Sequence, residues 1–263
     1  MIAPLLILTM KWGDLYGPHY VNNLAHGVRR HLNRPHRFIC FTDDASGLDR
    51  EIEALPLPSL GVPESHGDTR WRKLALFRKN LEGLSGTALF LDLDLVIVDD
   101  LGPMFDLEGE FFIIRDDDLF RAKPLRKSNP ARDRLLHSTG NSSVFRYEIG
   151  AHSYILDAFI ADPAAATSRY EISQQFQSAQ LAKNGHLAYW PKKWCVSFKN
   201  HCVPRGLKSF FVDPSRPEGA KIVVFAGSPK MDDALTGKGR KWYRRIGDVS
   251  WLRSLWEGPE QSR

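Results

Sequence analysis

The sequence predicts an α/β fold in which helices cover both faces of a central sheet. Short apolar runs of strand length alternate along the chain with segments whose apolar residues recur at helical spacing. We find neither an internal repeat nor a linker, and 263 residues suffice for one large domain, or two small ones, with a substantial core. Sheets of this kind bind ligands where strands end and loops begin, so function is sought at the strand ends.

Strands are expected at apolar runs that end at polar residues. The run LLILTM lies near the N-terminus, and RFICFT ends at Asp43-Asp44. The longest run, ALFLDLDLVIV, is interrupted only by Asp92 and Asp94. In chain order the expected strands are 4–10, 37–42, 88–98, 110–115, 187–190 and 222–225, with a further short apolar stretch at 143–146.

Helices are expected where apolar residues recur every three or four positions, as Val21, Leu24 and Val28 do. The segment 117–139 is rich in Arg, Lys, Pro and Asn and is expected to be a mobile loop. The acidic run at 116–118 is expected to be a solvated loop, and contact with acceptor hydroxyls is the less favoured alternative. The expected helices are 19–32, 69–81, 149–160 and 173–183.

Composition is that of an ordinary soluble globular protein, with 43% hydrophobic and 25% charged residues. Cys40, Cys195 and Cys202 form no CxxC pair and no even set, which disfavours a disulfide framework and a zinc site. The apolar stretch at the N-terminus is only about seven residues long and has no basic start, too short for a signal peptide or a membrane span. A cytosolic protein is therefore expected.

The C-terminal segment 238–256, KGRKWYRRIGDVSWLRSLW, interleaves basic and aromatic side chains. This composition suits an anionic membrane surface, where cations meet head groups and indole rings lie at the boundary. It is equally compatible with a C-terminal helix that packs its aromatic residues on the domain. A nucleic-acid backbone would also attract such a segment, but we favour it least and expect no nucleic-acid partner.

Asp92 and Asp94 are two residues apart, so on an extended chain their carboxylates point to the same side. Two adjacent buried anions require a positive partner. A divalent metal held together with a substrate diphosphate would meet this requirement. Structural pairing with Arg72 or Lys73 would meet it equally well.

Six further segments, together with these aspartates, resemble the GT-A glycosyltransferases, and most specifically bacterial enzymes related to family 8. The motif LFLDLDLVIVDDL, preceded by WRKLALF, is similar to the nucleotide-sugar-binding half of those enzymes. The resemblance covers about residues 5 to 232. Its other segments, in order, are LTMKWGDLYGPHYVNNL, FTDD, GNSSVFRYE, ISQQFQSAQL, WPKKWCVSFK and VVFAGSPK. It implies a GT-A, Rossmann-like single domain with a mixed, mainly parallel sheet.

For the nucleotide, the resemblance implies contacts from the ends of the first two strands. Thr9 and the turn at Lys11 and Trp12 would touch the uracil and ribose of a UDP-sugar. Tyr16 would offer a ring for stacking, and Asp43 would lie near the base.

For the diphosphate, the resemblance implies two lysines and the two aspartates. Lys73 would reach the diphosphate or the donor sugar, and Lys230 would bind the departing phosphate. Asp92 would approach the ribose and a Mn²⁺ or Mg²⁺ ion, and Asp94 would be the principal metal ligand and a catalytic residue.

For the sugar, the resemblance implies contacts from a second pair of segments. Asn141 and Ser143 would contact the donor hexose. Gln174 and Gln175 would lie near the anomeric carbon as catalytic residues.

Two positions depart from the family pattern. Relatives have a metal-binding His one or three residues before the closing Gly227, where this chain has Ala226 and Val224. The metal would then bind weakly, or only together with the donor. An acidic residue is common at the position of Gln174, whose amide can stabilise charge but cannot act as a base.

The expected function is transfer of a hexose from a UDP-sugar to a hydroxyl of a surface glycan or lipid-linked saccharide, with retention of configuration. Residues 1–235 would form the transferase domain, and residues 236–263 a basic aromatic segment that contacts the inner face of the membrane. Two alternatives remain. One is a nucleotide-sugar-binding protein that has lost catalysis, and the other is a metal-dependent nucleotidyltransferase or phosphohydrolase.

Overall fold

Seven strands form the central sheet of the computed structural model, which describes residues 4–63, 70–120, 134, 137–237 and 245–257. Most of the loop expected at 117–139 lies outside these residues. Across the sheet, the strands are β3 (Glu53–Pro56), β2 (His36–Thr42), β1 (Leu5–Lys11), β4 (Thr87–Leu91), β7 (Gly140–Glu148), β6 (Phe111–Arg115) and β8 (Ala188–Tyr189).

The sheet is mixed and mainly parallel, which confirms the expected fold class. β3, β2, β1 and β4 run parallel to one another, β7 is antiparallel to both its neighbours, and β8 is parallel to β6. A second sheet consists of β5 (Leu95–Ile97), β10 (Ile222–Val224) and β9 (Cys195–Ser197).

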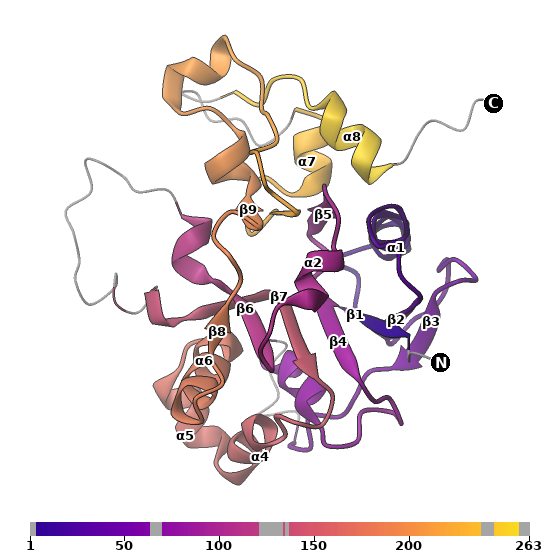
Figure 1. Ribbon diagram of the computed structural model, residues 1–263, viewed down its shortest axis with the longest axis vertical. Helices are drawn as coiled ribbons and strands as arrows, with labels where there is room; N and C mark the ends of the chain where they lie inside the picture. Colours follow the sequence, from indigo (N-terminus) through magenta and orange to yellow (C-terminus); the bar gives the residue numbers. More distant parts are fainter. Residues whose placement is uncertain (1–3, 64–69, 121–133, 135–136, 238–244, 258–263) are drawn as a thin grey trace.

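Both faces of the central sheet are covered, as the sequence predicts. On β1, Ile7 packs in one core with α1 (Pro18–His31) and the small sheet, whereas Leu6 and Leu8 point into a second core. This second core contains η2 (Arg72–Phe77), α4 (Tyr154–Ala161) and α6 (Ser173–Lys183). In Figure 1, α1 and α4 lie on opposite sides of the strands.

The remaining elements are short and lie mainly at the edges of the sheets. They are α2 (Gly102–Asp106), η3 (Asp116–Leu119), α5 (Pro163–Arg169), η4 (Phe198–Cys202), η5 (Gly206–Phe210), α7 (Met231–Leu235) and α8 (Ser250–Trp256). α5, like the strands β3 and β9, was not expected from the sequence because it is brief and lacks a clear apolar period.

The single strand expected at 88–98 is wrong. The chain leaves the central sheet after β4, bends at Asp92–Asp94, and enters the small sheet as β5. The Asp92 N–H still donates to the Ser143 carbonyl at 2.9 Å, and the Asp94 carbonyl accepts from the Phe225 N–H at 2.8 Å. The two aspartates are therefore neighbours in a bend between two sheets, where partly buried carboxylates can reach the surface.

Two expected helices begin later or are shorter than predicted. The segment expected at 69–81 forms only the 3₁₀ helix η2, because its consecutive residues from Leu74 to Phe77 are all buried and leave no polar face. The helix expected from residue 149 begins at Tyr154. Gly150 precedes it at φ +83° and approaches the Lys79 carbonyl so closely that a Cβ would lie 2.8 Å from that oxygen.

The C-terminal aromatic residues in the described part pack on the domain, as one of the two favoured interpretations predicts. Trp256 and Leu252 of α8 are buried, and the Trp256 ring meets Tyr20 of α1 edge-on, with 5.2 Å between ring centres. The Trp251 indole donates to the Pro214 carbonyl at 2.9 Å. None of the helices described combines the length and apolar character that a bilayer span needs.

Candidate functional site

The carboxyl ends of β1, β2 and β4 meet at one edge of the central sheet because these strands are parallel. Lys11, at the end of β1, donates from its Nζ to the Asp44 carbonyl at 3.3 Å. The Asp43 carboxylate accepts from the Gly13 N–H at 3.0 Å. Lys11, Trp12 and Asp43, predicted to contact the nucleotide, therefore lie together at this edge.

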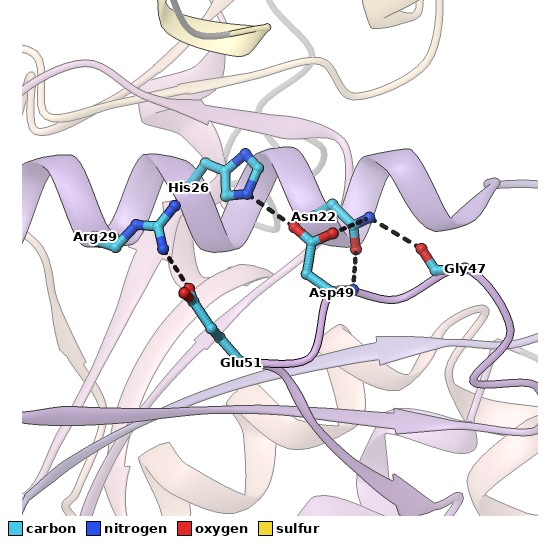
Figure 2. Close-up of polar contacts among 6 residues, drawn as sticks. All are labelled: Asn22, His26, Arg29, Gly47, Asp49 and Glu51. Atoms are coloured by element: carbon cyan, nitrogen blue, oxygen red, sulfur yellow. Dashed lines mark hydrogen bonds and ion pairs between the residues drawn. The ribbon is translucent and has the colours of Figure 1, made fainter.

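Helix α1 fixes the loop that follows β2, as Figure 2 shows. The Asn22 amide donates to the Gly47 carbonyl at 3.0 Å and to Asp49 at 3.1 Å, and its oxygen accepts from the Asp49 N–H at 3.1 Å. His26 contacts the same Asp49 carboxylate at 2.8 Å, and Arg29 pairs with Glu51. These contacts hold the loop that begins at Asp43 against α1.

Lys73 of η2 pairs with Asp92. Its Nζ lies 2.6 Å from Asp92 Oδ2 and donates weakly to the Ser142 carbonyl at 3.4 Å. Both side chains are only about one-fifth exposed, at 19% and 21%, so solvent screens this pair less than a surface pair. Asp92 thus has the basic partner that the sequence allowed, and its expected contact with a metal stays a prediction.

Asp94 lies beside Tyr16, close enough for the two side chains to influence each other's protonation. Burial, and then the negative charges of Asp94 and Asp92, raise the pKa of the Tyr16 hydroxyl. Burial and then the charge of Asp92 raise the pKa of Asp94 to about 6, and the Lys73 cation opposes this shift. Lys230 completes the group, with its Nζ 5.4 Å from the centre of the Tyr16 ring. Residues from four distant segments thus meet at one polar cluster.

The protein side chains fit a divalent metal only if a ligand supplies further oxygens. In the described part of the chain, no group of three His, Cys, Asp or Glu side chains could hold an ion. Val224 is fully buried in β10, and Ala226 has no donor atom. Asp94 and Asp92 alone remain as metal ligands, and Asp92 already faces an ammonium group. Such a pair fits an ion that is held jointly with a diphosphate.

The residues predicted to contact the sugar lie at the start of β7 and of α6. The Asn141 oxygen accepts from the Ser143 N–H at 3.1 Å, and the Gln174 oxygen accepts weakly from the Ser142 N–H at 3.4 Å. Gln175 turns away, since its side-chain oxygen accepts from the Glu171 N–H at 3.1 Å. Of the two glutamines, Gln174 is thus the one that contacts β7.

Asp116 belongs to this sugar-side cluster, although the sequence suggested a solvated acidic loop. It is only 9% exposed, and the Asn141 amide donates to its carboxylate at 3.1 Å. Burial raises the pKa of Asp116, and the hydrogen bond from Asn141 opposes that shift. The expectation for Asp116 was wrong because η3 turns its side chain inward immediately after β6. Its position at a strand end was the available signal.

Thr9 and Lys199 are two further polar residues of this region. Thr9 lies in the middle of the buried strand β1, and its hydroxyl has no hydrogen-bond partner among the described residues. Lys199 of η4, which the sequence did not single out, donates to the Ala226 carbonyl at 2.9 Å. A Cβ on Gly227 would lie 3.4 Å from Lys199 Nζ, so this lysine adds positive charge beside the closing glycine.

The mixed, mainly parallel sheet with helices on both faces has the GT-A fold that the sequence resemblance implies. No family model and no curated protein matches the chain. Among solved structures, the galactosyltransferase LgtC in complex with donor and acceptor sugar analogues aligns with a TM-score of 0.57 and 14% identity, over 86% of this chain and 88% of LgtC. An active-site mutant of LgtC, in which a glutamine is replaced by glutamate, aligns with a TM-score of 0.54 and 14% identity, over 97% and 98% of the two chains. At this identity the similarity shows a shared fold.

Proposed function

We propose that this protein is a glycosyltransferase that moves a hexose from a UDP-sugar to an acceptor hydroxyl. The observation that supports this most strongly is the cluster of Lys73, Asp92, Asp94, Tyr16 and Lys230. It combines anionic and cationic groups at the sheet edge where the fold allows a nucleotide to bind. LgtC, which shares the fold, was crystallised with donor and acceptor sugar analogues.

The nucleotide would bind where β1 and β2 end. Lys11, Trp12 and Asp43 are adjacent there, and the partly buried rings of Trp12 and Tyr16 offer faces for the uracil. The unpaired hydroxyl of Thr9 is a further polar group in β1 that a ribose or base could satisfy.

The diphosphate would lie between the two lysines and the two aspartates. Asp94, with Asp92, would hold Mn²⁺ or Mg²⁺ together with the donor. When bound, such an ion neutralises charge on the leaving diphosphate. Lys73 and Lys230 would stabilise the same charge through their ammonium groups. Because Lys73 pairs with Asp92 before the donor binds, donor and metal would bind in a coupled manner.

The hexose would lie against Asn141 and Ser143, with Gln174 near the anomeric carbon. The family resemblance suggests retention of configuration, which requires no general base, and a glutamine amide oxygen can stabilise positive charge developing on the sugar. LgtC also has a glutamine in its active site. Gln175 would act indirectly, since its side chain is bonded at the start of its own helix.

We further propose a cytosolic enzyme in which residues 1–235 form the transferase domain and residues 236–263 follow it. Its acceptor would be a surface glycan or lipid-linked saccharide at the inner face of the membrane. A second candidate is a nucleotide-sugar-binding protein without transfer activity. Val224 and Ala226 favour it, because the family that the sequence resembles has a metal-binding His at one of these positions.

A panel of UDP-hexoses, incubated with Mn²⁺ and a saccharide acceptor, tests the proposal by its products. Glycosyl transfer or donor hydrolysis releases UDP. Release of hexose 1-phosphate would instead indicate nucleotidyl transfer, and binding of UDP without any release would indicate the binding protein. The linkage of the product, determined by NMR, decides whether configuration is retained.

A further inference from the structure

Large apolar side chains are exposed together in one short segment at residues 207–212. Four of the seven exposed large hydrophobic residues in the described chain lie there, namely Leu207 (70% exposed), Phe210 (43%), Phe211 (87%) and Val212 (43%). We call this segment, which includes the end of η5, the apolar turn. It belongs to the orange part of the chain at the top of Figure 1, at the opposite end from α4, α5 and α6.

The apolar turn is held in place by polar contacts beneath it. Ser209, at the centre of the segment, is 2% exposed, and its hydroxyl donates to the Gly206 carbonyl at 2.7 Å and accepts from the Arg245 N–H at 2.9 Å. The Phe211 N–H donates to the Lys208 carbonyl at 3.1 Å. The segment therefore buries its small polar residue and exposes its large apolar ones, the reverse of the usual surface pattern.

Basic residues accompany these apolar side chains. Arg205 and Lys208 are exposed within and beside the turn, and Arg245 is exposed where its backbone meets Ser209. Apolar side chains next to positive charge match a surface with an apolar interior and anionic head groups.

We propose that the apolar turn docks on an anionic lipid bilayer, with Phe210 and Phe211 entering the boundary between head groups and acyl chains. The size of the surface favours a bilayer over a second copy of the chain. The four side chains expose roughly 450 Å², at about 150–200 Å² for each full side chain. A stable protein interface requires about 800 Å² per partner.

This docking surface differs from the one that the sequence suggested, because Trp251, Leu252 and Trp256 of the C-terminal segment pack on the domain. The proposal rests on the proposed function only in that it brings the transferase to a lipid-linked acceptor. Membrane binding can therefore be measured independently of glycosyl transfer.

Co-sedimentation of the full-length protein with vesicles tests the proposal. The vesicles contain phosphatidylcholine and phosphatidylglycerol in equal amounts, and pure phosphatidylcholine vesicles serve for comparison. Wild type is expected to bind the anionic vesicles and to dissociate as salt is raised. The double substitution Phe210→Ser and Phe211→Ser is expected to weaken binding at least about tenfold. The matched control is Ile160→Ser, which removes an exposed apolar side chain from α4, far from the turn.

Unchanged vesicle binding by the double variant would overturn the proposal, as would failure of wild type to bind. Sedimentation velocity tests whether a second copy of the chain covers the apolar turn instead. If wild type is a dimer and the double variant is a monomer, the turn is a contact between copies and the proposal is overturned. UDP binding, measured on the same variants, is expected to remain at the wild-type level. Absence of UDP binding by wild type would contradict the proposed function and would leave the result on vesicle binding unaffected.

Discussion

The Lys73 ammonium group lies 2.6 Å from the Asp92 carboxylate, at the bend where the chain passes from the central sheet to the small sheet. The ammonium group of Lys73 thus lies beside Asp92 and Asp94, the two aspartates that the family resemblance predicts to bind a metal. The Coulomb attraction of Lys73 also opposes the rise in the pKa of Asp94. Lys73 therefore offsets the negative charge of the aspartates, and we expect it to offset the charge of the diphosphate as well.

Lys73→Gln should weaken UDP binding by about ten- to a hundredfold, because it removes a charge-assisted contact to the diphosphate and leaves Asp92 without its cation. Isothermal titration calorimetry measures the effect. Lys79→Gln is the matched control, since this exposed lysine follows η2 without facing the aspartates. Equal affinities for wild type and Lys73→Gln would mean that Lys73 serves only the structure.

The two glutamines at the start of α6 should respond differently to substitution. Gln174→Ala is expected to lower the turnover number by about ten- to a hundredfold, because its amide oxygen lies at β7 beside the proposed hexose site. Gln175→Ala should change it by less than about threefold, since that side chain bonds to Glu171. Steady-state kinetics with saturating donor measures both. A larger loss for Gln175→Ala would reverse the assignment.

Trp256→Ala should destabilise the whole domain by about 3–5 kcal/mol, because the buried indole packs on Tyr20 and within the core that contains α1 and the small sheet. Urea denaturation measures the change in the free energy of unfolding. Ser254→Ala, on the exposed side of the same helix, should cost less than about 0.5 kcal/mol. A loss no larger than that control would mean that α8 folds independently of the core.

His152 should contribute a loss of stability as the pH drops through about 6.5, whereas the raised pKa of Asp94 acts in the opposite direction. Burial and then the neighbouring His186 lower the pKa of His152, whose Nε2 has no hydrogen-bond partner among the described residues. The unfolded chain then takes up a proton before the folded protein does, so acid favours unfolding. Glu110 acts in the opposite direction, and the Tyr154 hydroxyl lies 3.2 Å from Nδ1.

Urea midpoints measured between about pH 7.5 and pH 5.5 report this slope. His152→Gln should reduce it without abolishing it, because burial also lowers the pKa of His31. If the substitution leaves the slope at its wild-type value, His152 is not the group responsible.

Long, strongly patterned elements could be predicted from the sequence, and interruptions could not. Helix α1 is found at Pro18–His31, one residue from the expected 19–32, because Val21, Leu24 and Val28 recur at helical spacing and are buried. The run at 88–98 is apolar enough for one strand, but two sheets share it, and only tertiary pairing of β5 with β10 reveals the break. The prediction of an α-helix at 69–81 was wrong for a related reason, since the four consecutive buried residues from Leu74 to Phe77 interrupt the period that identifies a helix.

Strand ends in the sequence indicated where the site residues would lie, but the sequence did not indicate which side chains would contact one another. Lys11, Asp43, Asp92 and Asp94 come from strand ends, and they lie at one edge as the parallel topology requires. Whether Asp92 faces a metal or Lys73, and whether Gln174 or Gln175 faces β7, depends on rotamers and on residues distant in sequence. The contribution of Lys199 likewise depends on the approach of η4 to Gly227.

The cluster around Asp94 is expected to bind a nucleoside diphosphate together with a divalent cation. The most direct test is calorimetric titration of UDP into wild type and Asp94→Asn, each with Mn²⁺ and with chelator. We expect wild type to bind UDP at least about tenfold more tightly with Mn²⁺, and Asp94→Asn to lose that difference. Absence of UDP binding by wild type under both conditions, or an unchanged Mn²⁺ effect in Asp94→Asn, would contradict the account.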